Sequence, residues 1–169
     1  MARALKHLSM NEFATMSESK SMALLAMARE LRSAALAGGT QRSLRGKNLA
    51  LICDASDAVG AGADLFRRAA SELGAKVTHL RPSLSLLSTQ EEVRHTARLL
   101  GRLYEALECV GLPPELVRRI GAEAGVPVFE AISSSTHPTS RLASRLDEHS
   151  LSEDSRCAVM QAVLLTALA

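Results

Sequence analysis

The chain contains no tryptophan, one tyrosine and three phenylalanines among its 169 residues. Proteins that bind single-stranded nucleic acid stack the bases on aromatic side chains, and this chain has almost none to offer. Its formal net charge of +2 is also too small for the strongly basic surface that nucleic acid attracts. The sequence therefore predicts no nucleic-acid partner.

Long apolar runs are missing as well. No apolar segment approaches the ~20 residues that a membrane-spanning helix needs, and the start of the chain soon turns polar, at Ser9, Asn11 and Glu12, without a signal-peptide core. The three cysteines are an odd number without metal-site spacing, which fits free thiols in a reducing compartment. The histidines are scattered too. We therefore expect no metal, no cofactor, no membrane partner and a cytoplasmic location.

Helical and strand-like segments alternate along the chain, which is typical of a parallel sheet covered on both faces. We predict a single three-layer α/β domain over residues 1–146, with about four parallel strands, and a C-terminal helix over 147–169 that packs on it. The expected strands cover 48–53, 76–80, 105–110 and 127–132. The expected helices cover 10–36, 63–73, 91–103, 114–121, 140–146 and 152–169.

Ligands of such sheets bind beyond the carboxyl ends of the strands. In this chain those positions are the loops 53–62, 81–90, 110–113 and 133–140. Any function is therefore expected to lie in these four loops.

The order and spacing of several segments carry a resemblance to a known family. They are Leu44-Arg-Gly-Lys-Asn-Leu-Ala-Leu-Ile52, Phe66 to Gly74, Thr96-Ala-Arg-Leu-Leu100, Gly125-Val-Pro-Val128 and His137-Pro138. From about Lys6 to Leu146 the chain resembles the carbamoyl-phosphate-binding domain of the aspartate and ornithine transcarbamylases. Asp154-Ser-Arg156 and residues 161–168 are similar to the C-terminal helix of ornithine transcarbamylases. The Ser-Met-Gly and His-Cys-Leu-Pro motifs of the family's amino-acid-binding domain do not occur.

The resemblance implies a phosphate site in the first loop, where the family has Ser-Thr-Arg-Thr-Arg. Depending on the register, this chain has Ser56-Asp-Ala-Val-Gly60 or Val59-Gly-Ala-Gly-Ala63 there, without arginine. Asp54 and Asp57 would repel a dianion.

Three further positions depart from the family and one matches. The family's arginine after the third strand aligns with Val110 and its glutamine with Ser140, while a basic residue from the neighbouring subunit aligns near Thr89. His137 matches the residue that contacts the carbamoyl oxygen. Loss of three arginine contacts would remove ~5–9 kcal/mol of binding free energy.

We therefore predict a degenerate ligand site and no catalytic residue. The site comprises His137, Ser56, Asp57, Gly60 and Ser140. Other interpretations stay open at this point. Gly60-Ala-Gly62 is either an anion cradle or a tight turn, His137 either a ligand contact or a loop histidine held by hydrogen bonds. Cys53 and Cys109 are expected to be buried, inert thiols that could be neighbours.

Three functions follow from these features. The favoured hypothesis is a catalytically inactive transcarbamylase-like protein that acts through assembly, as a homotrimer or in a complex with an active transcarbamylase, because the family forms trimers through this domain. The second is a regulator that binds a neutral or cationic small molecule in the polar crevice around His137. The third is a carbamoyltransferase subunit completed by a partner chain.

Overall fold

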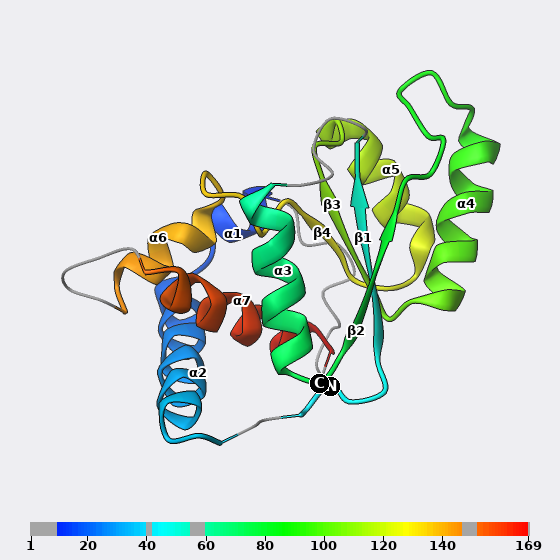
Figure 1. Cartoon of the computed structure of the whole chain (residues 1–169). Helices are drawn as coiled ribbons and strands as arrows, with labels where there is room; N and C mark the ends of the chain where they lie inside the picture. The colour runs from blue at the N-terminus through cyan, green and yellow to red at the C-terminus, as the bar shows by residue number, and fades with distance from the viewer. Residues whose placement is uncertain (1–9, 40–41, 55–59, 147–151, 169) are drawn as a thin grey trace.

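The computed structural model describes residues 10–39, 42–54, 60–146 and 152–168. Its centre is one four-stranded parallel sheet in the order β2-β1-β3-β4 (Figure 1). The strands are β1 (Asn48–Cys53), β2 (Lys76–Leu80), β3 (Ala106–Val110) and β4 (Val128–Glu130). This confirms the predicted parallel sheet. The strand order changes direction between β1 and β3, and at such a point a crevice opens beyond the strand ends.

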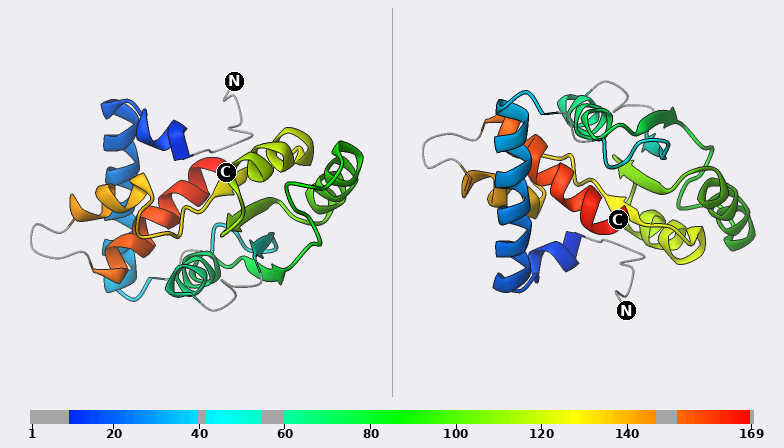
Figure 2. Two further views of the ribbon diagram at one scale, coloured as in Figure 1. Left: turned by 90° about the horizontal axis from the view of Figure 1, so that it is seen from above. Right: turned by 90° about the horizontal axis from the view of Figure 1, so that it is seen from below.

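Helices cover both faces of the sheet, as predicted. They are α1 (Met10–Ala14), α2 (Glu18–Leu36), α3 (Ala61–Glu72), α4 (Gln90–Leu103), α5 (Pro114–Ala124), α6 (Pro138–Ser144) and α7 (Glu153–Leu168). Figure 2 shows α4 and α5 together on one side of the molecule, while α7 lies between α3 and α2 on the other. The second face thus carries two layers of helix, with α2 and α6 packed on α7.

Strand β1 is buried on both faces, which explains its unbroken run of apolar residues. Leu49 and Leu51 point to the core shared with α2, α3 and α7. Ala50 and Ile52 point to the smaller core under α4 and α5. Helix α7 is apolar on most sides because it is enclosed by α2, α3 and α6.

The expected helix over 10–36 is wrong in one respect, since the structure has two helices there. Ser17 adopts an extended conformation and its hydroxyl accepts a hydrogen bond from the backbone N–H of Lys20 at 3.4 Å. This N-cap starts α2 afresh and separates it from α1. The apolar spacing continues through the break, so periodicity alone did not reveal it.

Other boundaries shift by a few residues. Strand β4 is shorter than predicted because Ala131 takes a left-handed conformation, with φ of 51°, and turns the chain. Helix α5 runs past Gly121 and ends where Gly125 adopts φ of 74°. Helix α6 begins at Pro138 rather than residue 140, because His137 caps it.

Candidate functional site

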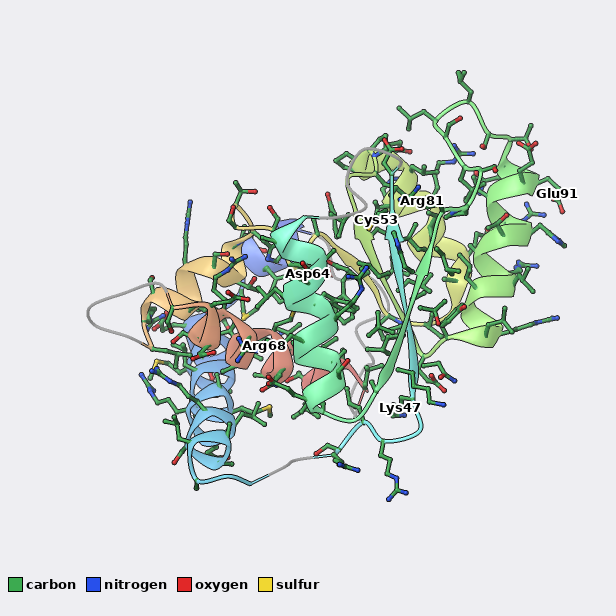
Figure 3. All side chains as sticks on the ribbon, viewed as in Figure 1. Lys47, Cys53, Asp64, Arg68, Arg81 and Glu91 are labelled. Carbon is green, nitrogen blue, oxygen red and sulfur yellow. The ribbon has the colours of Figure 1, made fainter. Side chains whose placement is uncertain are left out.

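The carboxyl ends of the strands gather the predicted loops at one edge of the sheet. In Figure 3, Cys53 and Arg81 lie at this edge and Lys47 lies at the opposite one. The backbone N–H of Asp54 donates to the carbonyl of Val110 at 3.3 Å, so the loops after β1 and β3 leave the sheet together. Ser56 and Asp57 of the predicted site lie outside the described residues.

Gly60 forms the N-cap of α3, where the family's phosphate site was expected. It is exposed, with φ of −101° and ψ of 154°, and contributes no side-chain cap. A helix N-terminus attracts anions through its free N–H groups and its dipole. The first turn of α3 already holds the carboxylate of Asp64, which pairs with Arg67 at 2.8 Å.

The loop between β4 and α6 packs tightly against the start of α3. A Cβ atom added to Gly62 would lie 3.0 Å from the carbonyl oxygen of Ser133 and 3.3 Å from its hydroxyl. Only glycine fits there without displacing the loop. The glycine at position 62 is therefore explained by close packing against Ser133, without an anion site.

His137 is buried, with 1% of its surface exposed. Its Nδ1 accepts a hydrogen bond from the backbone N–H of Thr139 at 3.2 Å and lies 2.9 Å from the hydroxyl of that residue. The ring meets that of Phe13 edge-on, with 5.0 Å between the centroids. His137 therefore caps α6 and fills the core beneath α1.

Burial lowers the pKa of His137 to about 4, so the imidazole is neutral at physiological pH. Since Nδ1 accepts a bond, the proton sits on Nε2, which has no hydrogen-bond partner among the described residues. A neutral, enclosed imidazole of this kind offers little attraction to a dianion.

Ser140 lies in the first turn of α6, three residues from His137 in the chain. Its hydroxyl donates to the carbonyl of Ser134 at 3.1 Å. It also lines a small cavity of about 10 Å³, bounded by Ile132, Thr139 and Arg156 among others. This volume is near that of one water molecule, not of carbamoyl phosphate. The structure thus places His137 and Ser140 on one capped turn and Gly60 on a separate helix.

Glu108 is the most unusual residue of this region, and the sequence analysis missed it. It lies in the middle of β3 and is fully buried. Its Oε1 accepts hydrogen bonds from the backbone N–H of Ser133 at 3.1 Å and from the hydroxyl of that residue at 2.9 Å. A charged residue inside an otherwise apolar strand was the available signal.

Burial raises the pKa of Glu108 to about 8, although the hydrogen bonds from Ser133 and the backbone of Ile132 oppose this shift. At neutral pH the carboxyl is therefore mostly protonated. Its Oε2 has no hydrogen-bond partner among the described residues. Glu108 acts as a neutral acceptor that holds the loop after β4.

Arg156 of α7 binds the same loop from the other side. Its Nη2 donates to the carbonyl of Ser133 at 3.0 Å. This guanidinium is half-buried and directed at the backbone, so it is a structural clamp. Val110 and Thr89 add no charge to the edge, since Val110 is apolar and Thr89 caps α4 by accepting from the N–H of Glu92 at 3.2 Å.

The predicted inert thiols can also be placed. Cys53 and Cys109 lie on neighbouring strands, opposite Val110 and Ile52 respectively. They belong to different cores on the two faces of the sheet, so their side chains point apart. Both are buried, and so is Cys157. Among the described residues, no group of three or more metal-binding side chains occurs, and no helix has the length and apolarity to cross a bilayer.

Comparisons with known proteins agree with this architecture. Curated relatives include ornithine carbamoyltransferases from Actinobacillus pleuropneumoniae, 40% identical over 120 residues, and from Haemophilus influenzae, 39% identical over 120 residues. In both cases the match covers 71% of this chain and only 35% of the relative. The chain thus spans about a third of the length of these enzymes.

Solved structures give the same result. Ornithine carbamoyltransferase from Pyrococcus furiosus matches 86% of this chain and 46% of its own, with a TM-score of 0.69 at 21% identity. The enzyme from Thermus thermophilus matches 83% of this chain and 47% of its own, with a TM-score of 0.65 at 26% identity. The sequence profile of the aspartate/ornithine carbamoyltransferase carbamoyl-P binding domain matches residues 7–147. The chain therefore belongs to the aspartate/ornithine carbamoyltransferase family, through its carbamoyl-P binding domain.

Proposed function

We propose that this chain is a non-catalytic member of the family that acts through assembly, as a homotrimer or bound to an active transcarbamylase. The observation that carries the proposal is a pair of exposed leucines on the loop between β2 and α4. Leu86 is 52% exposed and Leu87 is 95% exposed. Large apolar side chains at the tip of a well-held loop suit burial against another protein surface.

The loop is held by hydrogen bonds within it and by one from α5. The backbone N–H of Leu87 donates to the hydroxyl of Ser85 at 3.2 Å, and the N–H of Ser85 donates to the hydroxyl of Ser88 at 3.0 Å. Arg119 of α5 donates to the carbonyl of Ser88 at 2.7 Å. A preformed loop loses little conformational entropy on association.

The resemblance supports the same surface. In the family, the loop that ends near Thr89 contributes a basic residue to the neighbouring subunit. Here the corresponding loop carries leucines instead. Such a change keeps an apolar contact between subunits and removes the basic group that the family's loop supplies to the neighbouring site.

The chemistry at the sheet edge supports inactivity. His137, which matches the family histidine that contacts the carbamoyl oxygen, is enclosed, Glu108 is neutral, and Val110 stands where the family has arginine. No lysine or arginine occurs between Asp54 and Ala63. Because phosphate sites depend on such cations, we expect no measurable binding of carbamoyl phosphate.

Light scattering of the purified chain at micromolar concentration tests assembly first. We expect a trimer, or a mixed oligomer after co-expression with an ornithine carbamoyltransferase. Leu87→Asp should weaken the association by at least about tenfold, because a buried leucine contributes about 1.5–3 kcal/mol. Leu36→Asp is the matched control, since Leu36 is 82% exposed and is the last residue of α2, outside the loop.

A strictly monomeric chain, with or without the enzyme, would contradict the proposal. Calorimetric titration with carbamoyl phosphate completes the test. Micromolar binding, or turnover with ornithine or aspartate once a partner is added, would instead favour a carbamoyltransferase subunit completed by another chain.

A further inference from the structure

A cavity of about 630 Å³ opens between α1, α2 and α7, apart from the loops at the sheet edge. Phe13, Leu24 and Val163 form its buried wall. Small-molecule sites have volumes of about 300–1,000 Å³ and mostly apolar linings with few polar groups. The cavity meets both criteria, and the small cavity at Ser140 meets neither.

Two methionines give the cavity an adaptable lining. Met16 and Met27 are half-buried, and they line the cavity from the turn before α2 and from its third turn. Methionine side chains are unbranched and polarizable, so they adjust to ligands of different shapes. This lining fits a flexible apolar chain better than a rigid, polar molecule.

The polar groups are confined to a few positions, and the charged ones are a lysine and a glutamate. Lys20 lines the cavity from the first turn of α2 and forms no ion pair among the described residues. The N-terminal end of α2 adds the positive end of the helix dipole at the same place. Glu12 also lines the cavity and carries the opposite charge.

We propose that this cavity binds an amphipathic small molecule with an apolar body and a single anionic head group, such as a carboxylate. The body lies against Phe13, Leu24 and Val163, and the head group meets Lys20 at the start of α2. This site is independent of carbamoyl phosphate and of the leucines on the β2–α4 loop.

Calorimetric titration with hexanoate, octanoate and decanoate tests the proposal on the intact chain. We expect affinity to rise about three- to fourfold for each added methylene, because each one buries further apolar surface. Decylamine of the same chain length tests the head group, and we expect it to bind more weakly than decanoate. Lys20→Ala should weaken the binding of decanoate by about two- to fivefold. Lys47→Ala should leave it unchanged, because Lys47 lies just before β1 and does not line the cavity.

Ala23→Phe tests the location. Ala23 is exposed and lines the cavity, so a phenyl group there occupies the ligand volume without disturbing the core. We expect decanoate binding to weaken at least about tenfold, which corresponds to the loss of roughly two buried methylenes. Ala26→Phe is the control, because Ala26 is exposed on the same helix but does not line the cavity.

Three results would overturn the inference. They are the absence of heat with millimolar decanoate, equal weakening by the two phenylalanine variants, and tighter binding of the amine than of the acid. Light scattering of the same samples detects a fourth contradicting result. If Ala23→Phe dissociates an oligomer and no probe binds, the cavity is a contact between subunits and not a ligand site. If Leu87→Asp dissociates the oligomer and decanoate still binds, the ligand site is independent of assembly.

Discussion

The carboxyl group of Glu108 accepts both hydrogen bonds that Ser133 can donate, from its backbone N–H at 3.1 Å and its hydroxyl at 2.9 Å. Ser133 follows Glu108 by 25 residues and belongs to the loop that carries His137. A buried side chain of the central sheet thereby helps to hold the loop that leads to His137. Two oppositely shifted pKa values, of Glu108 and of His137, meet at this loop, and they predict how stability depends on pH.

Glu108→Gln should remove a loss of stability that the parent chain shows between about pH 4.5 and pH 8. The pKa of Glu108 is about 8 in the folded chain against an ordinary 4.5, so between these values the folded chain holds a proton that the unfolded chain has released. Stability contributed by this group is therefore complete below about pH 4.5 and is lost as pH rises toward 8. The loss by pH 8 is on the order of 4–5 kcal/mol.

Urea unfolding from pH 5 to pH 9 measures this effect. Glutamine keeps the acceptor at Oε1 and cannot ionise. The free energy of unfolding of the variant should therefore increase relative to that of the parent as pH rises. Parallel profiles would show that Glu108 is ionised in the folded chain.

His137→Asn should change the acid side. Burial lowers the pKa of His137 to about 4 from an ordinary 6.5, so its contribution to stability is complete above about pH 6.5 and is lost as pH falls toward 4. The loss amounts to about 3 kcal/mol. Asparagine retains an N-cap acceptor for α6 but does not titrate.

In the parent chain Glu108 partly hides this loss of stability. As pH falls, the stabilising contribution of Glu108 increases over part of the range in which that of His137 decreases. The comparison is therefore best made in the Glu108→Gln background, by thermal unfolding between pH 4 and pH 7. An unchanged acid slope after His137→Asn would place the titrating group elsewhere.

Gly62→Ala should destabilise the chain, and Gly60→Ala should do so far less. The new methyl group at position 62 would lie 3.0 Å from the carbonyl oxygen of Ser133, whereas at position 60 no atom lies within 4 Å. Overpacking of this kind costs about 1–3 kcal/mol. Chemical denaturation of the two variants decides the point, and equal stabilities would mean that the loop after β4 moves freely.

The three thiols should resist modification in the folded chain. Burial is the main cause that raises the pKa of Cys157 to about 12 and that of Cys109 above its ordinary range. Since the thiolate is the reactive form, labelling with a disulfide reagent should be at least about a hundredfold slower than in urea. Rapid labelling of one thiol in the native chain would show local opening around that cysteine.

The strands could be predicted from the sequence because burial on both faces leaves a continuous apolar run, as in Asn48–Cys53. The helix boundaries were harder where a side chain decides them. Ser17 restarts a helix within an unbroken apolar pattern, and His137 starts α6 two residues early through its own ring nitrogen. Such caps depend on local hydrogen bonds that periodicity does not record.

The site itself was only partly predictable. His137 and Ser140 were singled out by resemblance, and the structure places both at the start of α6, while their role in a site stays a prediction. Glu108 and Arg156 were not singled out for the site, because their common partner Ser133 lies 25 and 23 residues away in the chain. Contacts of this range follow from the crossing of β3, α7 and the loop in space, which the sequence does not display.

The enclosure of α7 between α2 and α3 has a consequence for how the chain folds. Arg32 of α2 donates to the hydroxyl of Ser155 in α7 across 123 residues of sequence. Closing so long a loop costs conformational entropy before any apolar contact is gained, and distant contacts of this kind slow folding. The apolar side of α2 is therefore covered only once α7 docks on it, so this distant pairing protects α2 from aggregation.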